Sequence, residues 1–120
     1  MKKGFVYLIG AGPGDPQLVT LKGRQILENC DAVVYDHLAS TVFLSWVPSH
    51  CRILYVGKQS GHHSMTQEQI NELLIKLALE GLKVVRLKGG DSFVFGRGSE
   101  EILALKEQGI GWEVVPGITS

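Results

Sequence analysis

The sequence lacks the features that define several large classes of protein. It has only 2 cysteines and 4 prolines in 120 residues, and its 12 basic side chains are balanced by 12 acidic ones. Two cysteines are too few for a disulfide-stapled secreted scaffold, and they form no CxxC pair. We therefore interpret Cys30 and Cys51 as small buried thiols in a reducing compartment, which predicts a cytoplasmic protein.

Long hydrophobic runs and an excess of charge of one sign are also missing. No apolar stretch approaches the roughly 20 residues that a membrane span requires. A formal net charge of zero argues against nucleic acid or a membrane surface as a partner. The 4 histidines show no metal-ligand spacing, so no metal is expected. What remains is one globular domain, because 44% hydrophobic residues are enough to build a core.

Short β-rich runs recur along the chain, and stretches with helical periodicity separate most of them. The runs are Phe5–Ile9, Ala32–Tyr35, Arg52–Val56, Lys83–Leu87 and Trp112–Val115. Their continuous apolar character is typical of strands that are covered on both faces. Alternation of strands and helices predicts an α/β fold with a five-stranded, mostly parallel, doubly wound sheet and helices on both faces.

The clearest helix is predicted from Thr66 to about Glu80, because Thr66 and Gln69 have the spacing of a capping box. Three further helices are predicted over residues 20–29, 42–46 and 99–109. Leu21, Ile26 and Leu27 form the apolar face of the helix at 20–29. In the helix that starts at residue 99, the acids Glu100 and Glu101 are interpreted as complements to the positive end of the helix dipole.

Unusual residues follow the predicted strands directly. Glycine-rich segments follow the first and fourth strands at residues 10–15 and 89–91, and Asp36 and Lys58 follow the second and third. Because ligands in such sheets bind at the carboxyl ends of the strands, these segments could share one site. A carboxylate and an ammonium group there could serve as base and acid, although most aspartates and lysines, taken one by one, are solvated or form weak surface pairs.

The glycine-rich segments have alternative explanations. Residues 10–15 could form a tight turn, and they match a dinucleotide fingerprint poorly because Asp15 stands where the third glycine belongs. The segment at 88–98 combines glycines with Phe93 and Phe95, which could wall a flat ligand or plug the core. Arg97 could bind a substrate carboxylate or pair with a glutamate of the following helix.

Several longer motifs resemble one known family, the tetrapyrrole methylases. The motifs are Val6–Pro16, Val33–Asp36, Val56–Lys58, Arg86–Asp91, Phe93–Gly98 and Val114–Ser120, and the resemblance extends over essentially the whole chain. The resemblance implies an S-adenosyl-L-methionine-dependent enzyme that releases S-adenosyl-L-homocysteine. It further implies transfer of two methyl groups to uroporphyrinogen III through precorrin-1, giving precorrin-2 on the way to sirohaem and cobalamin, by a homodimer.

The resemblance also assigns roles to individual residues. Asp36 would be the proton acceptor and Lys58 the proton donor. The residues that would contact S-adenosyl-L-methionine are Pro13, Gly89, Gly90, Asp91, Val94, Thr119 and Ser120. Two positions depart from the family pattern, since His37 stands where arginine is common and Ser92 where proline is usual.

The family resemblance places residues 1–120 as the single N-terminal α/β domain of such an enzyme, without the second domain that the family has, and the isolated domain is therefore expected to have little or no activity. Three alternatives remain open at this point. The first is another tetrapyrrole methylase, such as a precorrin-4 methyltransferase. The second is a non-catalytic module that binds tetrapyrrole without turnover. The third is a nicotinamide-binding domain, which the missing third glycine disfavours.

Overall fold

The fold is a five-stranded parallel sheet with helices on both faces. The computed structural model describes residues 3–12, 20–57, 65–89 and 97–115. The strands are β1 (Phe5–Gly12), β2 (Ala32–Tyr35), β3 (Arg52–Tyr55), β4 (Lys83–Gly89) and β5 (Gly111–Val115). The helices are α1 (Leu21–Glu28), the 3₁₀ helix η2 (Leu38–Trp46), α2 (Gln67–Leu79) and α3 (Arg97–Glu107). The strand order is β3-β2-β4-β1-β5, which confirms the predicted fold class.

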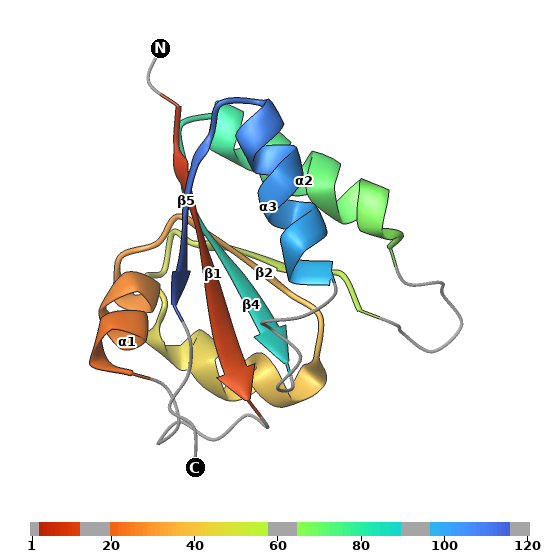
Figure 1. Ribbon diagram of the computed structural model, residues 1–120. Helices are drawn as coiled ribbons and strands as arrows, with labels where there is room; N and C mark the ends of the chain where they lie inside the picture. The colour runs from red at the N-terminus through yellow and green to blue at the C-terminus, as the bar shows by residue number, and fades with distance from the viewer. Residues whose placement is uncertain (1–2, 13–19, 58–64, 90–96, 116–120) are drawn as a thin grey trace.

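Alternate residues of each inner strand face opposite layers of helices. Figure 1 shows α2 and α3 together on one side of the sheet and α1 on the other. Val6, Val34 and Val84 belong to the core cluster that includes buried residues of α2 and α3. Val33 and Val85 belong to the second cluster, with α1 and η2. Both faces are therefore apolar, as continuous hydrophobic runs require.

The predicted helix boundaries are set by the expected capping groups. Thr66 accepts a hydrogen bond from the backbone N–H of Gln69, and the Gln69 side chain accepts one from Thr66, so the capping box of α2 is confirmed. Gly81 follows α2 with a φ of 87°, a left-handed conformation that glycine adopts at little cost. The prediction for Leu21 is wrong, because its side chain lies 81% exposed at the first position of α1, whereas Leu27 is fully buried.

Two predicted helices differ in their bounds from the structure. The segment predicted as a short helix at 42–46 is the longer 3₁₀ helix η2, which begins at Leu38. The helix predicted to start at residue 99 begins at Arg97.

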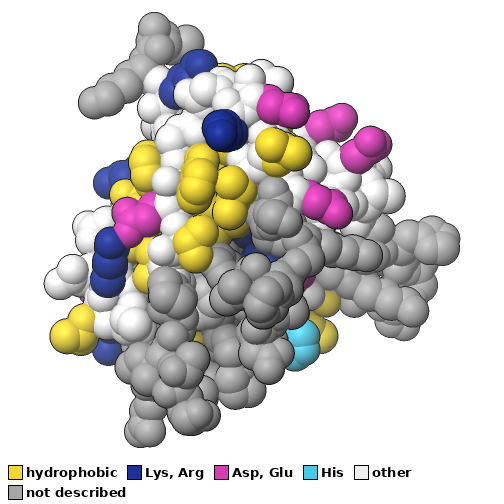
Figure 2. Space-filling model, in the orientation of Figure 1, with side chains coloured by type: hydrophobic (Ala, Val, Ile, Leu, Met, Phe, Trp, Pro, Cys, Tyr) yellow, Lys and Arg dark blue, Asp and Glu magenta, His cyan; other side chains and the backbone are white. Residues whose placement is uncertain are grey.

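Charged groups of both signs are spread over the helices, and Figure 2 shows acidic side chains gathered over the α2 and α3 side. None of the helices described is both long enough and apolar enough to cross a membrane.

The two cysteines lie side by side, although 21 positions separate them in the sequence. Their Sγ atoms are 3.6 Å apart, Cys30 is buried and Cys51 is partly buried, and both are free thiols. The prediction of a buried thiol is confirmed for Cys30. Burial, together with the neighbouring sulfur, raises the pKa of the Cys30 thiol, and burial also raises the pKa of Cys51. Both side chains are therefore neutral at physiological pH.

Asp31 joins three strands at the amino-terminal edge of the sheet. Its carboxylate accepts a hydrogen bond from the backbone N–H of Lys83 (2.9 Å) and contacts His50 Nε2 at 3.1 Å. Its backbone carbonyl accepts from the N–H of Arg52 at 3.0 Å. The hydrogen bond from Lys83 lowers the pKa of Asp31 below its ordinary value of 3.8, and His50 adds to this effect.

We expect Asp31→Asn to lower the free energy of unfolding by about 1 kcal/mol at pH 7, because a charge-assisted hydrogen bond is lost. A carboxyl whose pKa is lower in the folded state stabilises the fold above its unfolded pKa, near 3.8, and loses that contribution as the pH falls through the folded value. The difference in the free energy of unfolding between wild type and variant should therefore shrink below about pH 4. Urea unfolding at pH 7 and pH 3 measures it, and a constant difference would contradict this account.

Candidate functional site

The carboxyl ends of the parallel strands meet at one edge of the sheet. β1 and β4 lie side by side in its centre, and Gly12 at the end of β1 is paired with Gly89 at the end of β4. Neither residue has a side chain, so neither has a Cβ that would keep a ligand away from the backbone at this point. Because ligands of open α/β sheets bind outside the carboxyl ends of the strands, this edge is the candidate site.

The strand register brings Asp36 next to two basic side chains of β4. Val34 of β2 is paired with Arg86, and Tyr35 with Leu87, so Asp36 follows at the level of Lys88. Side chains two residues apart on a strand share a face. Arg86 and Lys88 therefore share the face of Val84, which belongs to the α2 and α3 core cluster. Asp36 lies on the same side, and its carboxylate contacts Arg86.

Arg86 is fixed through all three of its guanidinium nitrogens. Its Nε donates to Glu101 Oε2 at 3.0 Å, its Nη2 donates to Asp36 Oδ2 at 3.3 Å, and its Nη1 donates to the carbonyl oxygen of Leu87 at 3.4 Å. The side chain is only 2% exposed, whereas that of Asp36 is 32% exposed. The arginine thus connects a buried carboxylate to one that water and ligands can reach.

Glu101 is the anion at the centre of this cluster, and it is fully buried on α3. Its Oε2 accepts from Arg86 and from the Nε2 of Gln67 (3.2 Å), and it lies 3.6 Å from the Nζ of Lys88. Among the described residues its Oε1 has no hydrogen-bond partner. Gln67, at the start of α2, also donates to Asn71 of the same helix at 2.9 Å. Its bond to Glu101 links α2 to α3, and the bond from Arg86 to Glu101 links both helices to β4.

The charges of the cluster balance. Two cations, Arg86 and Lys88, face two carboxylates, Asp36 and Glu101, beneath the candidate edge. Burial lowers the pKa of Lys88, while the Glu101 carboxylate opposes that change. Removing ions from water is costly, and only close pairing and hydrogen bonds offset the cost. A cluster of this kind is better suited to fixing the geometry of one accessible group than to stabilising the fold.

Gly57 is packed against the backbone of Asp36. A Cβ atom at this position would collide with the carbonyl oxygen of Asp36 and lie 2.6 Å from the hydroxyl of Tyr55. Tyr55 in turn packs against Tyr35, with ring centroids 5.0 Å apart. Only glycine allows the chain after β3 to approach the chain after β2 so closely.

We expect Gly57→Ala to lower the free energy of unfolding by about 1–3 kcal/mol and to displace Asp36, because a backbone atom cannot move aside as a side chain can. Thermal and urea unfolding measure the stability. Gly109→Ala is the control, because it strains a glycine with a φ of 68°. Gly109 lies between α3 and the amino end of β5, at the edge of the sheet opposite to Asp36. Any activity that depends on Asp36 should fall in Gly57→Ala and not in Gly109→Ala. Equal activities of the two variants would contradict the argument that Gly57 sets the position of Asp36.

The structure places only part of the predicted site. Asp36 lies at the carboxyl edge as predicted, and the backbone of Gly89 ends β4 there. The other predicted site residues lie outside the described residues, and they are Pro13, Lys58, Gly90, Asp91, Val94, Thr119 and Ser120. In sequence, Pro13 directly follows β1 and Gly90 directly follows β4. Within the described part of the chain no group of three or more possible metal ligands occurs.

Sequence reasoning missed three residues of the cluster: Arg86, Lys88 and Glu101. A signal for the first two was present, because charged residues at alternate positions of an otherwise apolar strand share one face. A signal for Glu101 was present as well, because it lies four residues before the buried Leu105 on the same helix face. The sequence interpretation instead took Glu101 as a complement to the helix dipole.

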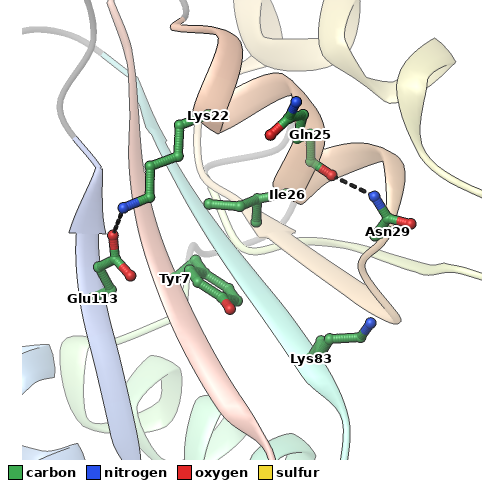
Figure 3. A pocket seen from close by; sticks show the side chains of 7 residues that line it. All are labelled: Tyr7, Lys22, Gln25, Ile26, Asn29, Lys83 and Glu113. Carbon is green, nitrogen blue, oxygen red and sulfur yellow. Dashed lines mark hydrogen bonds and ion pairs between the residues drawn. The ribbon is translucent and has the colours of Figure 1, made fainter.

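A separate pocket lies on the α1 face of the sheet. Its volume is about 310 Å³, and none of the predicted site residues lines it. Figure 3 shows Tyr7 of β1 beneath it, with Lys22 of α1 paired to Glu113 of β5 across one side. Lys83, at the amino end of β4, also lines it. This pocket is therefore distinct from the edge that carries Asp36.

Comparisons with known proteins bear on this arrangement. A family model described as tetrapyrrole (corrin/porphyrin) methylases matches residues 5–120. The uroporphyrinogen-III C-methyltransferase of Methanocaldococcus jannaschii is 56% identical over 117 residues, which are 98% of this chain and 48% of that protein. The enzyme of the same name from Bacillus subtilis is 54% identical over 120 residues, which are 100% of this chain and 25% of that protein.

A solved structure shows the same fold. The uroporphyrin-III C-methyl transferase from Thermus thermophilus complexed with S-adenyl homocysteine superposes with a TM-score of 0.77 at 46% identity. The match covers 97% of this chain and 46% of that one. The chain thus spans about half the length of that structure and of one of the two relatives, and a quarter of the other.

Proposed function

This chain belongs to the tetrapyrrole methylases, and from that membership we propose that the protein transfers methyl groups from S-adenosyl-L-methionine to uroporphyrinogen III. Two transfers, through precorrin-1, would give precorrin-2, a precursor of sirohaem and cobalamin. The single observation that carries the proposal is the position of Asp36, a partly exposed carboxylate held by a buried arginine at the carboxyl edge of the sheet. Identities of 54–56% to two proteins named uroporphyrinogen-III C-methyltransferase support the choice of substrate.

The glycine-lined edge fits an S-adenosyl-L-methionine site. Gly12 and Gly89 are paired where β1 and β4 end, so no side chain at either position blocks a ligand from the backbone. The residues proposed to hold the cofactor lie, in sequence, at or after the ends of β1, β4 and β5. They are Pro13, Gly89, Gly90, Asp91, Val94, Thr119 and Ser120. When bound, S-adenosyl-L-methionine supplies a methyl group already activated by the sulfonium charge. The related structure with S-adenyl homocysteine supports this assignment.

The residues of this chain then have to position the substrate and move protons. Asp36 is proposed as the base that accepts a proton from the macrocycle after a carbon atom has taken the methyl group. Lys58, which directly follows Gly57, is proposed as the proton donor. Positioning contributes as much as proton transfer, since the donor and the attacking carbon must be aligned. The oriented contact from Arg86 keeps the Asp36 carboxylate in one place for this step.

We also propose that the protein acts as a homodimer in the cytoplasm, and that residues 1–120 form the N-terminal domain of the enzyme. The family resemblance supports these proposals. Size-exclusion chromatography with light scattering tests the dimer, and a mass equal to one chain at micromolar concentration would contradict it.

The proposed reaction is tested with labelled S-adenosyl-L-methionine. Anaerobic incubation of the enzyme that carries this chain as its N-terminal domain with uroporphyrinogen III and methyl-labelled donor should give a product that carries two labelled methyl groups by mass spectrometry. Calorimetry with S-adenosyl-L-homocysteine measures cofactor binding independently. Binding without methyl transfer would contradict the choice of substrate, and absence of binding would contradict the proposed cofactor site. Competition with NAD in the same titration tests the nicotinamide alternative.

A further inference from the structure

The buried partners of Asp36 form a unit that the proposed reaction does not by itself require. Arg86 reaches Asp36 with one nitrogen and Glu101 with another, and the backbone carbonyl of Leu87 holds the third. We propose that Arg86, clamped by Glu101, is the positioning residue that sets the direction of the Asp36 carboxylate at the edge of the sheet. The proposal rests on the proposed function only for the catalytic role of Asp36.

The geometry favours positioning over simple charge compensation. A guanidinium group is planar, and its donors point in fixed directions. Contacts at Nε (3.0 Å), Nη1 (3.4 Å) and Nη2 (3.3 Å) therefore determine the plane of the Arg86 group and the direction of the bond to Asp36. A flexible cation on the surface could neutralise the carboxylate, but it could not orient it. Burial of Arg86 to 2% exposure removes the water that would compete for these donors.

Glu101 is the fixed end of the clamp. It is fully buried on α3, and it also takes a hydrogen bond from Gln67 of α2. The position of Arg86 thus depends on two helices and on β4, so a rigid layer of the fold defines it. Lys88 lies near the same oxygen at 3.6 Å and contributes a second positive charge close to Asp36. The clamp therefore connects the helical layer to the accessible carboxylate.

A paired replacement can remove the clamp without leaving a buried charge alone. Apolar residues of similar volume often replace a buried ion pair without loss of stability. The double variant Arg86→Met/Glu101→Leu therefore keeps the layer packed, while Lys88 loses its contact with Glu101 and keeps Asp36 as a nearby carboxylate. The matched control is Arg52→Met/Glu80→Leu, which removes a surface pair of the same residue types, 3.2 Å apart. That pair lies between the start of β3 and the end of α2, away from Asp36.

We expect the paired replacement to lower kcat about 100-fold, because a small misplacement of a catalytic group has an effect of this size. The KM for S-adenosyl-L-methionine should stay within about twofold of wild type, because neither Arg86 nor Glu101 is among the residues proposed to hold the cofactor. Arg86→Lys should recover part of kcat, since it restores a cation but not the fixed fork. The control should keep wild-type kcat. An unchanged kcat in the paired variant, or equal losses in the control, would overturn the proposal.

A second measurement does not depend on turnover. Urea unfolding of wild type, the paired variant, Asp36→Ala and the variant with all three replacements forms a double-mutant cycle between the clamp and Asp36. We expect a coupling of about tenfold in the unfolding equilibrium constant, and no coupling would show that the clamp does not hold Asp36. If the wild-type protein binds cofactor but transfers no methyl group, the proposed function is wrong. The unfolding cycle still tests the clamp in that case, because it does not depend on turnover.

Discussion

Replacing Glu101 alone with leucine is expected to lower the free energy of unfolding by about 3–5 kcal/mol, a large share of the stability of a small domain. The variant leaves Arg86 and Lys88 in the interior with Asp36 as their remaining carboxylate partner. The fully buried position allows no water to replace the lost anion, and loss of the Glu101 carboxylate, which opposes the effect of burial, should lower the pKa of Lys88 further. Urea unfolding followed by circular dichroism measures the loss.

The paired variant Arg86→Met/Glu101→Leu should remain within about 1 kcal/mol of wild type in the same experiment, because neither charge of the pair is then left unmatched. The order of stability, with the single variant far below the paired one, is the signature of a buried ion pair. If both variants lost the same amount, the packing of the side chains rather than their charge would explain the cost.

Replacing Asp36 with asparagine is expected to lower kcat for methyl transfer by about 10²–10⁴-fold, the range for loss of a general base. Asparagine keeps an oxygen that accepts from Arg86 Nη2 but cannot take a proton at neutral pH. The affinity for S-adenosyl-L-homocysteine should change by less than about twofold, because the proposed cofactor residues belong to other strand ends.

Asp31→Asn is the matched control, because Asp31 lies at the opposite end of β2 and its carboxylate bonds Lys83 rather than the site. That variant should lose stability and keep kcat. Assays use labelled S-adenosyl-L-methionine, and titration calorimetry follows cofactor binding. Wild-type turnover in Asp36→Asn would show that another group accepts the proton.

Local patterns were enough to predict the sheet and the position of Asp36. The second strand has the bounds that its apolar run predicts, Ala32–Tyr35, and the capping box at Thr66 fixes the start of α2. Because parallel strands end at one edge, the polar residue after β2 could be assigned to that edge without knowing the strand order. This rule predicts where Asp36 lies, and the family resemblance supplies its expected role as the proton acceptor.

The surroundings of Asp36 could not be predicted in the same way. Its partner Arg86 is 50 positions away, and their contact requires β2 and β4 to be neighbours. Glu101 differs from the adjacent Glu100 only in the direction in which α3 presents it, and the structure buries one and exposes the other. The proximity of Cys30 and Cys51 likewise depends on the pairing of β2 with β3. Contacts of this kind follow from topology, which short-range patterns do not contain.

The central place of β1 has a consequence for how the chain folds. Phe5 is paired with Lys83 on one side and with Gly111 on the other, so both neighbours of β1 in the sheet come from strands that follow it much later in the chain. Closing such long loops is slow, because their entropy is lost before any pairing is gained. Until then the apolar β1 has both of its edges unpaired, which makes the nascent chain a candidate for chaperone binding.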